Sequence, residues 1–332
     1  MLTDSFTRTL DYLRVSITDR CNLRCSYCMP PQGVQWKPHG DMLSFEEIIR
    51  IVRIMAGMGI RKIKVTGGEP LLRRGTASFL KSIKAIQGIE KVTLTTNGIL
   101  LGRYLDEALA LGPDSLPDGI NISLDALDGG RYKRITHCGD IEPEKILSMV
   151  DRLLELHIPV KINCVSVKGI NEEEILPLAA LARDRDISVR FIELMPLGAA
   201  AAFRPVPGGE VAARLETAYG PLAPVSGVFG NGPAVYYRLP GFTGMTGFIN
   251  PVTHGFCETC NRLRLNSEGF LILCLSNDLG LDLRRPVRSG VGDTELAEII
   301  TGIVAQKPRF HTLSETYGAP EQHPGGMSKI GG

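Results

Sequence analysis

The sequence predicts an α/β fold with a parallel sheet, open or curled into a TIM-like partial (β/α)6 barrel, followed by a smaller C-terminal domain with β character. Three observations predict it. Segments with alternating apolar residues recur over the first two hundred residues, at intervals long enough for a crossover helix. The polar positions of these segments share one face. Beyond residue 196 the composition changes, because Gly, Ala and Pro become dense.

The predicted strands are short and are separated by helical stretches. They cover residues 12–17, 62–66, 92–96, 120–124, 160–165 and 188–192. The first helix is expected at Phe45–Met58, because Ser44 and Glu47 have the spacing of a capping box. Strand–helix alternation of this kind indicates that the strands run parallel.

One face of each predicted strand is polar. Arg14, Lys64, Lys161 and Arg190, for example, alternate with apolar neighbours. A sheet that is buried on both faces would show nearly continuous apolar runs. The polar face therefore favours a barrel with a solvated lumen that holds a polar ligand. The alternative is that these positions are solvent-exposed edges of the sheet.

The region beyond the sixth predicted strand is expected to contain a linker and a second unit. Residues 198–232 predict a linker with little regular structure. β character returns at Val235–Leu239 and at Arg262–Cys274. The tail from Pro320 is rich in Gly and Pro, and we expect it to be mobile. We assign residues 1–225 to the barrel domain and 226–332 to the C-terminal domain.

The composition limits the classes of partner. The chain has 332 residues, a formal net charge of +1, 43% hydrophobic and 22% charged residues. A net charge near zero gives no general field for nucleic acid or a membrane surface. There is no apolar run of about 18 residues and no basic start followed by an apolar stretch. We therefore expect a cytoplasmic protein with no nucleic-acid or membrane partner.

A first group of cysteines directly follows the first predicted strand. Cys21, Cys25 and Cys28 have the spacing CxxxCxxC, and the loops after barrel strands are where such folds place their chemistry. Clustered cysteines in a reducing compartment more often hold metal than form disulfides. Three thiolates can hold three irons of a [4Fe–4S] cluster and leave the fourth iron open.

A second group consists of Cys257, Cys260 and Cys274. The loop Ser267-Glu268-Gly269 predicts a β-hairpin, because it is three residues long and ends in Gly. Pairing about this loop sets Cys274 opposite Arg262 and therefore beside Cys260. This arrangement predicts a second [4Fe–4S] cluster with an open iron.

Zinc is the alternative for both groups. Tetrahedral zinc needs a fourth ligand beyond the three thiolates, so another residue would have to supply it. His39 or a distant cysteine could complete the first site. His254 or Cys164 could complete the second. Cys138 stands alone in the sequence and is expected in a loop.

Arg262 and Arg264 are two residues apart on a predicted strand, so both side chains project from one face. Two guanidinium groups beside an open iron would suit a phosphate-bearing substrate. Together with the four inner-face cations they would form a cationic lumen in a nearly neutral protein. The alternative is a solvated strand face.

The first cysteine motif resembles the signature of radical S-adenosylmethionine (SAM) enzymes, since the aromatic Tyr27 precedes its last cysteine. The segment Thr66-Gly67-Gly68-Glu69-Pro70 after the second strand resembles the GGEP segment of that family. The resemblance implies a radical SAM barrel in which the open iron chelates SAM. Reduction then splits SAM into methionine and a 5′-deoxyadenosyl radical.

Over nearly the whole chain the sequence resembles the GTP 3′,8-cyclase family of molybdenum cofactor biosynthesis. The matching stretches are 13–21, 66–72, 94–98, 122–125, 189–196, the CxxCxRxR segment and the terminal Gly-Gly. The resemblance implies a lyase in which the radical abstracts the 3′ hydrogen of GTP and the ribose carbon attacks C8 of guanine. Reduction of the resulting radical then gives 3′,8-cyclo-7,8-dihydro-GTP.

The resemblance also implies roles for single residues. The expected SAM contacts are Tyr27, Gly68, Ser123, Arg190 and Met195. The expected GTP contacts are Arg14, Lys64, Thr95, Lys161, Arg262, Leu263 and Arg264, of which Arg14, Arg262 and Arg264 are the catalytic candidates. The expected iron ligands are Cys21, Cys25, Cys28, Cys257, Cys260 and Cys274. Lys64 replaces the family's usual Arg, which keeps the charge but loses the bidentate fork.

The implied cofactors are two [4Fe–4S] clusters and SAM. The implied partners are GTP as substrate, an external one-electron reductant, and cyclic pyranopterin monophosphate synthase as the next enzyme, with a homodimer as the candidate assembly. Two alternatives stay open. The protein could be another radical SAM enzyme with an auxiliary cluster, such as a peptide-modifying one, or a zinc-binding protein without catalysis.

Overall fold

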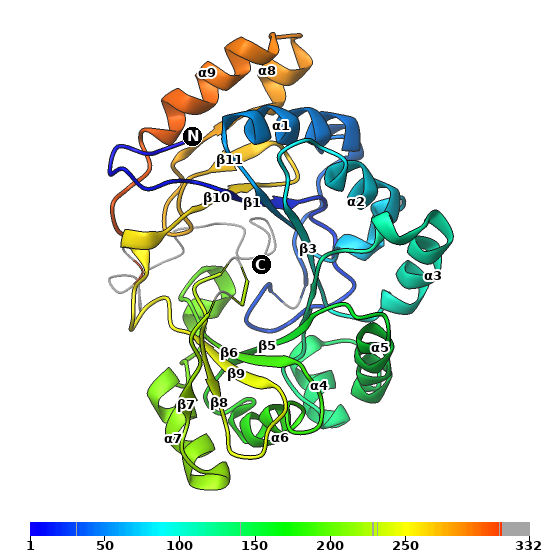
Figure 1. The fold of residues 1–332 in the computed structure, drawn as a ribbon, viewed down its shortest axis with the longest axis vertical. Helices are drawn as coiled ribbons and strands as arrows, with labels where there is room; N and C mark the ends of the chain where they lie inside the picture. Colours follow the sequence, from blue (N-terminus) through cyan, green and yellow to red (C-terminus); the bar gives the residue numbers. More distant parts are fainter. Residues whose placement is uncertain (31, 140, 228, 231, 312, 314–332) are drawn as a thin grey trace.

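The strands of the protein form one curved sheet with helices on its outer side (Figure 1). The computed structural model describes residues 1–30, 32–139, 141–227, 229–230, 232–311 and 313. The order of neighbouring strands is β12-β11-β10-β1-β2-β3-β4-β5-β6-β9-β8-β7. None of the described helices is both long and apolar enough to cross a membrane.

Six consecutive strands form the parallel centre of the sheet, as predicted. They are β1 (Tyr12–Ser16), β2 (Lys62–Thr66), β3 (Lys91–Thr96), β4 (Ile120–Ser123), β5 (Val160–Ser166) and β6 (Ser188–Glu193). The intervening helices are α1 (Phe45–Met58), α2 (Thr76–Lys84), α3 (Leu101–Leu111), α4 (Gly129–Thr136), α5 (Pro143–Glu155) and α6 (Ile175–Ala180). The α/β barrel-like fold is thereby confirmed.

Helix α1 begins where the capping box predicted. The Ser44 side chain accepts from the Glu47 amide at 3.2 Å, and the Glu47 carboxylate accepts from the Ser44 amide at 2.7 Å. The helix ends at Gly59, whose φ of 117° is a left-handed conformation that glycine adopts without strain. Ile48, Val52 and their neighbours on one side of the helix are buried against the sheet.

The apolar positions of the strands face the helices. Leu13, Val15, Ile63 and Val65 belong to one core cluster between sheet and helices. The alternating positions face the concave side of the sheet, where Arg14, Lys64 and Arg190 line a cavity. This arrangement confirms the prediction of a polar inner face, and it excludes the alternative that these positions are exposed edges.

Strands from the C-terminal part extend both edges of this sheet. Strand β10 (Arg262–Leu265) runs parallel to β1, and β9 (Met245–Ile249) runs parallel to β6. The antiparallel outer strands are β11 (Phe270–Ile272) and β12 (Gly280–Asp282) beyond β10, and β8 (Val235–Arg238) and β7 (Ala223–Pro224) beyond β9. Both predicted domains therefore contribute to one sheet, and the boundary at residue 225 stays a prediction.

The predicted hairpin has the predicted register. Arg264 pairs with Ile272 and Leu265 with Leu271. Extending this register by two residues on each strand sets Arg262 opposite Cys274. Gly269 in the turn has a φ of 91°, which explains why the loop ends in glycine.

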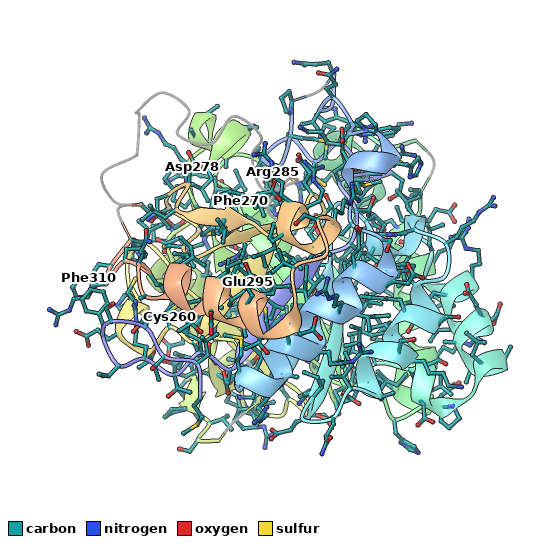
Figure 2. The ribbon with its side chains drawn as sticks, turned by 90° about the horizontal axis from the view of Figure 1, so that it is seen from above. Cys260, Phe270, Asp278, Arg285, Glu295 and Phe310 are labelled. Carbon is teal, nitrogen blue, oxygen red and sulfur yellow. The ribbon has the colours of Figure 1, made fainter. Side chains whose placement is uncertain are left out.

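The prediction of an unstructured linker at 198–232 is wrong for its central part. Helix α7 (Gly208–Tyr219) lies there and buries Val211 and Leu215. Alanine density suggested a linker, yet alanine is the strongest helix former. Two further helices, α8 (Arg284–Arg288) and α9 (Asp293–Val304), follow the last strand, and α9 packs beside α1 (Figure 2). The predicted mobile tail from Pro320 lies outside the described residues.

Candidate active site

The concave side of the sheet encloses a cavity that both cysteine groups line. Its volume, about 320 Å³, lies within the range of small-molecule sites. All six cysteines expected to bind iron line it, as do the expected SAM contacts Tyr27, Gly68, Ser123, Arg190 and Met195. The expected GTP contacts on its wall are Arg14, Lys64, Thr95, Arg262 and Arg264.

The first cysteine group forms a tight turn after β1. The Cys28 amide donates to the Cys25 carbonyl at 2.8 Å, and the Leu23 amide donates to Cys21 Sγ at 3.4 Å. Burial, Asp125 and the neighbouring thiols raise the pKa of Cys25 well above its usual range. Burial likewise raises the pKa of Cys28 to about 12. Thiolates in such a place require a bound cation, which is what an iron cluster supplies.

The Gly67-Gly68 pair packs against this cysteine loop. A Cβ atom on Gly68 would lie 2.4 Å from the Arg20 carbonyl oxygen, so only glycine fits. The next residue, Glu69, is buried and accepts hydrogen bonds from the Leu71 amide at 3.0 Å and the Asn97 amide at 2.7 Å. Glu69 does not line the cavity, and its hydrogen bonds with Thr96 and Asn97 link the turn after β2 to the end of β3.

Tyr27 is oriented by a carboxylate whose role the sequence did not reveal. Its hydroxyl donates to Asp125 Oδ2, and Asp125 Oδ1 accepts from the Val165 amide at 2.8 Å. Burial raises the pKa of Asp125 to about 6. Asp125 lies on the predicted polar face and in a matching stretch, but no local signal indicated that it contacts Tyr27.

The cavity wall between the two cysteine groups is cationic. Lys64, Arg190 and Arg264 have no acidic partner within the described part of the chain. Burial, Arg190 and Arg14 hold the pKa of Lys64 well below its usual range. Burial and the neighbouring arginines lower the pKa of Arg264 to about 9. Such a wall favours a multiply charged anion.

Neutral side chains hold part of this wall in place. Arg190 donates from Nε to Asn163 Oδ1 and from Nη2 to Asn121 Oδ1, both at 2.8 Å. Asn121 in turn donates to Thr95 Oγ1 at 3.1 Å. Because the partners are uncharged, the guanidinium keeps its full positive charge toward the cavity.

Two expected GTP contacts do not line the cavity. Lys161 donates to the Phe229 carbonyl and lies 5.5 Å from the Tyr236 ring centroid. Leu263 is fully buried in the core, because it alternates with Arg262 and Arg264 and therefore faces the other side of β10. Only the main chain of Leu263 is therefore left to contact a ligand in the cavity.

Sequence reasoning missed Tyr12, which lines the cavity from β1. Its position two residues before Arg14, on the same face, was a signal that could have found it.

The second cysteine group lies at the opposite end of the parallel strands from the GGEP turn, because Cys260 precedes β10 whereas the turn follows β2. The Cys260 amide donates to the Cys257 carbonyl at 3.2 Å, and Cys274 Sγ lies 3.3 Å from Ser276 Oγ. Burial alone would raise the pKa of Cys260, but Lys307 and Arg262 lower it below its usual value. The buried Lys307 also lines the cavity and was not found from the sequence.

None of the three named candidates for a fourth zinc ligand lines the cavity. Cys164 is buried in the core on the helix-facing side of β5, and His39 and His254 do not line the cavity. Across the described ranges, no three His, Cys, Asp or Glu side chains converge on a single-ion site. In a [4Fe–4S] cluster each thiolate binds a different iron, whereas a zinc ion needs all of its ligands at one point.

Comparisons with known proteins agree with this geometry. The profile of the Radical SAM superfamily matches residues 15–182, and that of Molybdenum Cofactor Synthesis C matches residues 187–313. The GTP 3′,8-cyclases of Moorella thermoacetica and Pelotomaculum thermopropionicum are 44% and 43% identical to this chain, with 99% of each chain covered. SuiB of Streptococcus suis, solved with S-adenosylmethionine, shares the fold, with a TM-score of 0.61 at 16% identity over 90% of this chain and 68% of SuiB.

A curved parallel sheet with a three-cysteine loop after its first strand defines the class of radical SAM proteins. Within that class, the identity over the full length assigns the family. The chain belongs to the GTP 3′,8-cyclase family.

Proposed function

We propose that the protein is a radical SAM lyase that converts GTP to 3′,8-cyclo-7,8-dihydro-GTP at the start of molybdenum cofactor biosynthesis. One observation carries the proposal: two groups of three cysteines line one cavity together with Lys64, Arg190 and Arg264, which have no acidic partner within the described ranges. A single radical SAM cluster would account for the first group. A nucleoside triphosphate substrate would account for the cationic wall and the second cysteine group.

The residues at one end of the cavity would bind SAM, and those at the other end would bind the guanine base. Cys21, Cys25 and Cys28 would hold the first [4Fe–4S] cluster, which with SAM supplies a 5′-deoxyadenosyl radical. The Gly68 turn and Tyr27, fixed by Asp125, would bind SAM beside that cluster. The second group would hold a second [4Fe–4S] cluster near the guanine base.

The cationic wall would bind and orient the triphosphate. Arg14, Arg262 and Arg264 converge from two neighbouring parallel strands, β1 and β10. Charge-assisted contacts from several directions hold the ribose in one orientation toward SAM, which is the main contribution a protein can make to such chemistry. The neutral bracing of Arg190 by Asn163 and Asn121 keeps that part of the wall fixed before the substrate arrives.

We also propose partners that follow from the reaction. Cleavage of SAM consumes one electron, and reduction of the cyclised radical consumes a second electron and a proton, so an external one-electron reductant is required. The cyclised nucleotide needs a consuming enzyme, for which cyclic pyranopterin monophosphate synthase is the candidate. Eight free cysteines suit the reducing cytoplasm, and a homodimer is the assembly to test by solution scattering.

Anaerobic incubation with SAM, GTP and dithionite, followed by mass spectrometry of the nucleotide, tests the function. We expect 5′-deoxyadenosine and a nucleotide isomeric with GTP that carries the C3′–C8 bond. Cys274→Ser should stop cyclisation, whereas the matched control Cys164→Ser, in the core, should not. Cleavage of SAM with the GTP left unchanged would contradict the proposal and favour another radical SAM activity.

A further inference from the structure

Lys307 is a buried lysine on the cavity wall whose role the proposed reaction does not explain. It follows helix α9, and only 3% of its surface is exposed. Its ammonium group donates to the carbonyl oxygen of Arg262 at 3.0 Å and to that of Leu273. No carboxylate within the described ranges pairs with it. Burying an ammonium group in this way is costly, so a compensating role is expected.

The two carbonyl groups that Lys307 contacts belong to the strands that position the second cysteine group. Arg262 follows Cys260 by two residues, and Leu273 directly precedes Cys274. The register of β10 and β11 sets these two ends side by side. Lys307 therefore bridges the open end of the hairpin, where Cys260 and Cys274 meet.

The segment around Lys307 is itself held in place. Arg8 donates to the carbonyl groups of Pro308 at 2.7 Å and Arg309 at 2.9 Å, and to that of Cys257 at 2.8 Å. Arg8 is neutralised by Asp4 at 2.6 Å. The two cations thus contact all three cysteine-bearing segments, and of the two only Arg8 has a carboxylate partner within the described ranges. Cys260 and Phe310 lie on the same side of the molecule (Figure 2).

We propose that Lys307 is a positioning residue for the second cysteine group. Its hydrogen bonds hold Cys260 and Cys274 at the spacing of a cluster, and its charge raises the reduction potential of a cluster bound there. Net charge and hydrogen bonding near the sulfurs are the properties that set such potentials. This inference rests on the second cluster of the proposed function.

Two substitutions separate the effect of the Lys307 hydrogen bonds from the effect of its charge. Lys307→Met removes both, and Lys307→Gln keeps donor hydrogens while removing the charge. Lys84→Met is the control, because Lys84 donates to the Leu116 carbonyl at 2.9 Å and to Asp118 Oδ1 at 2.8 Å, and it does not line the cavity. Iron and sulfide per chain are measured after anaerobic reconstitution. A background with Cys21, Cys25 and Cys28 replaced by Ser isolates the second cluster for a redox titration followed by EPR.

We expect Lys307→Met to lose about half of the iron while SAM cleavage at the first cluster persists. Lys307→Gln should retain the iron but show a more negative potential for the second cluster, because reduction adds a negative charge that the ammonium no longer offsets. Lys84→Met should match the unmodified protein.

Unchanged iron content in Lys307→Met, or an unchanged potential in Lys307→Gln, would overturn the proposal. If Lys307→Met does not fold, the reduction potential of the second cluster in Lys307→Gln tests the proposal by itself. An unmodified chain that reconstitutes with only one cluster would instead refute the second cluster itself, so the two failures are distinguishable.

Discussion

Arg264 offers the sharpest test of the cationic wall. It is buried, its Nε has no hydrogen-bond partner among the described residues, and it lies beside Arg14 and Arg262. Arg264→Met removes the charge and keeps most of the apolar stem. A charge-assisted contact is worth about 1.5–3 kcal/mol, so GTP should bind about tenfold to a hundredfold more weakly.

The same substitution should stabilise the protein without GTP. Like charges repel in a buried site, and removing one of them lowers that repulsion. Anaerobic calorimetry measures the GTP affinity, and thermal unfolding measures the stability. Arg285→Met is the control, because the Arg285 side chain, labelled in Figure 2, is 88% exposed and does not line the cavity. Unchanged GTP affinity in Arg264→Met would refute the phosphate-binding interpretation of this wall.

Further predictions concern the cysteines, Glu69 and the C-terminus. Replacing a cysteine of the first group should abolish SAM cleavage, and replacing one of the second group should remove about half of the iron and stop cyclisation. Cys138→Ala and Cys164→Ala should keep the iron, as measured by colorimetric assay, and a loss of half in either would contradict the ligand assignment. Burial raises the pKa of Glu69 to about 7, so the native state binds more protons than the unfolded state between about pH 4.5 and 7. Stability should therefore fall as the pH rises through this window, and Glu69→Gln should lose that slope in urea titrations, although the variant is less stable throughout. Deleting Gly331-Gly332, which lie outside the described residues, should leave both clusters and SAM binding intact yet strongly reduce the cyclised product. A truncated chain with full activity would show that the terminal glycines are dispensable.

Local sequence patterns were sufficient to predict those features of the fold that depend on interactions between residues close in sequence. The alternation in the strands placed Arg14, Lys64 and Arg190 on the inner face, because side chains of a strand point alternately to its two faces. The capping box fixed the start of α1. The glycine of the hairpin loop fixed the register that brings Cys274 beside Cys260, since a turn of defined length leaves only one pairing.

Only the tertiary structure decided which distant segments pair. No local signal places β9 beside β6 or β10 beside β1, because a strand's backbone hydrogen bonds accept any partner of suitable geometry. The contacts of Asp125 with Tyr27, and of Lys307 with the cysteine hairpin, likewise join residues far apart in sequence. The sequence by itself predicted the candidate cluster ligands and the polar lumen. The fold decided that both cysteine groups and the cations share one cavity, because that convergence depends on how the C-terminal strands add to the two edges of the sheet.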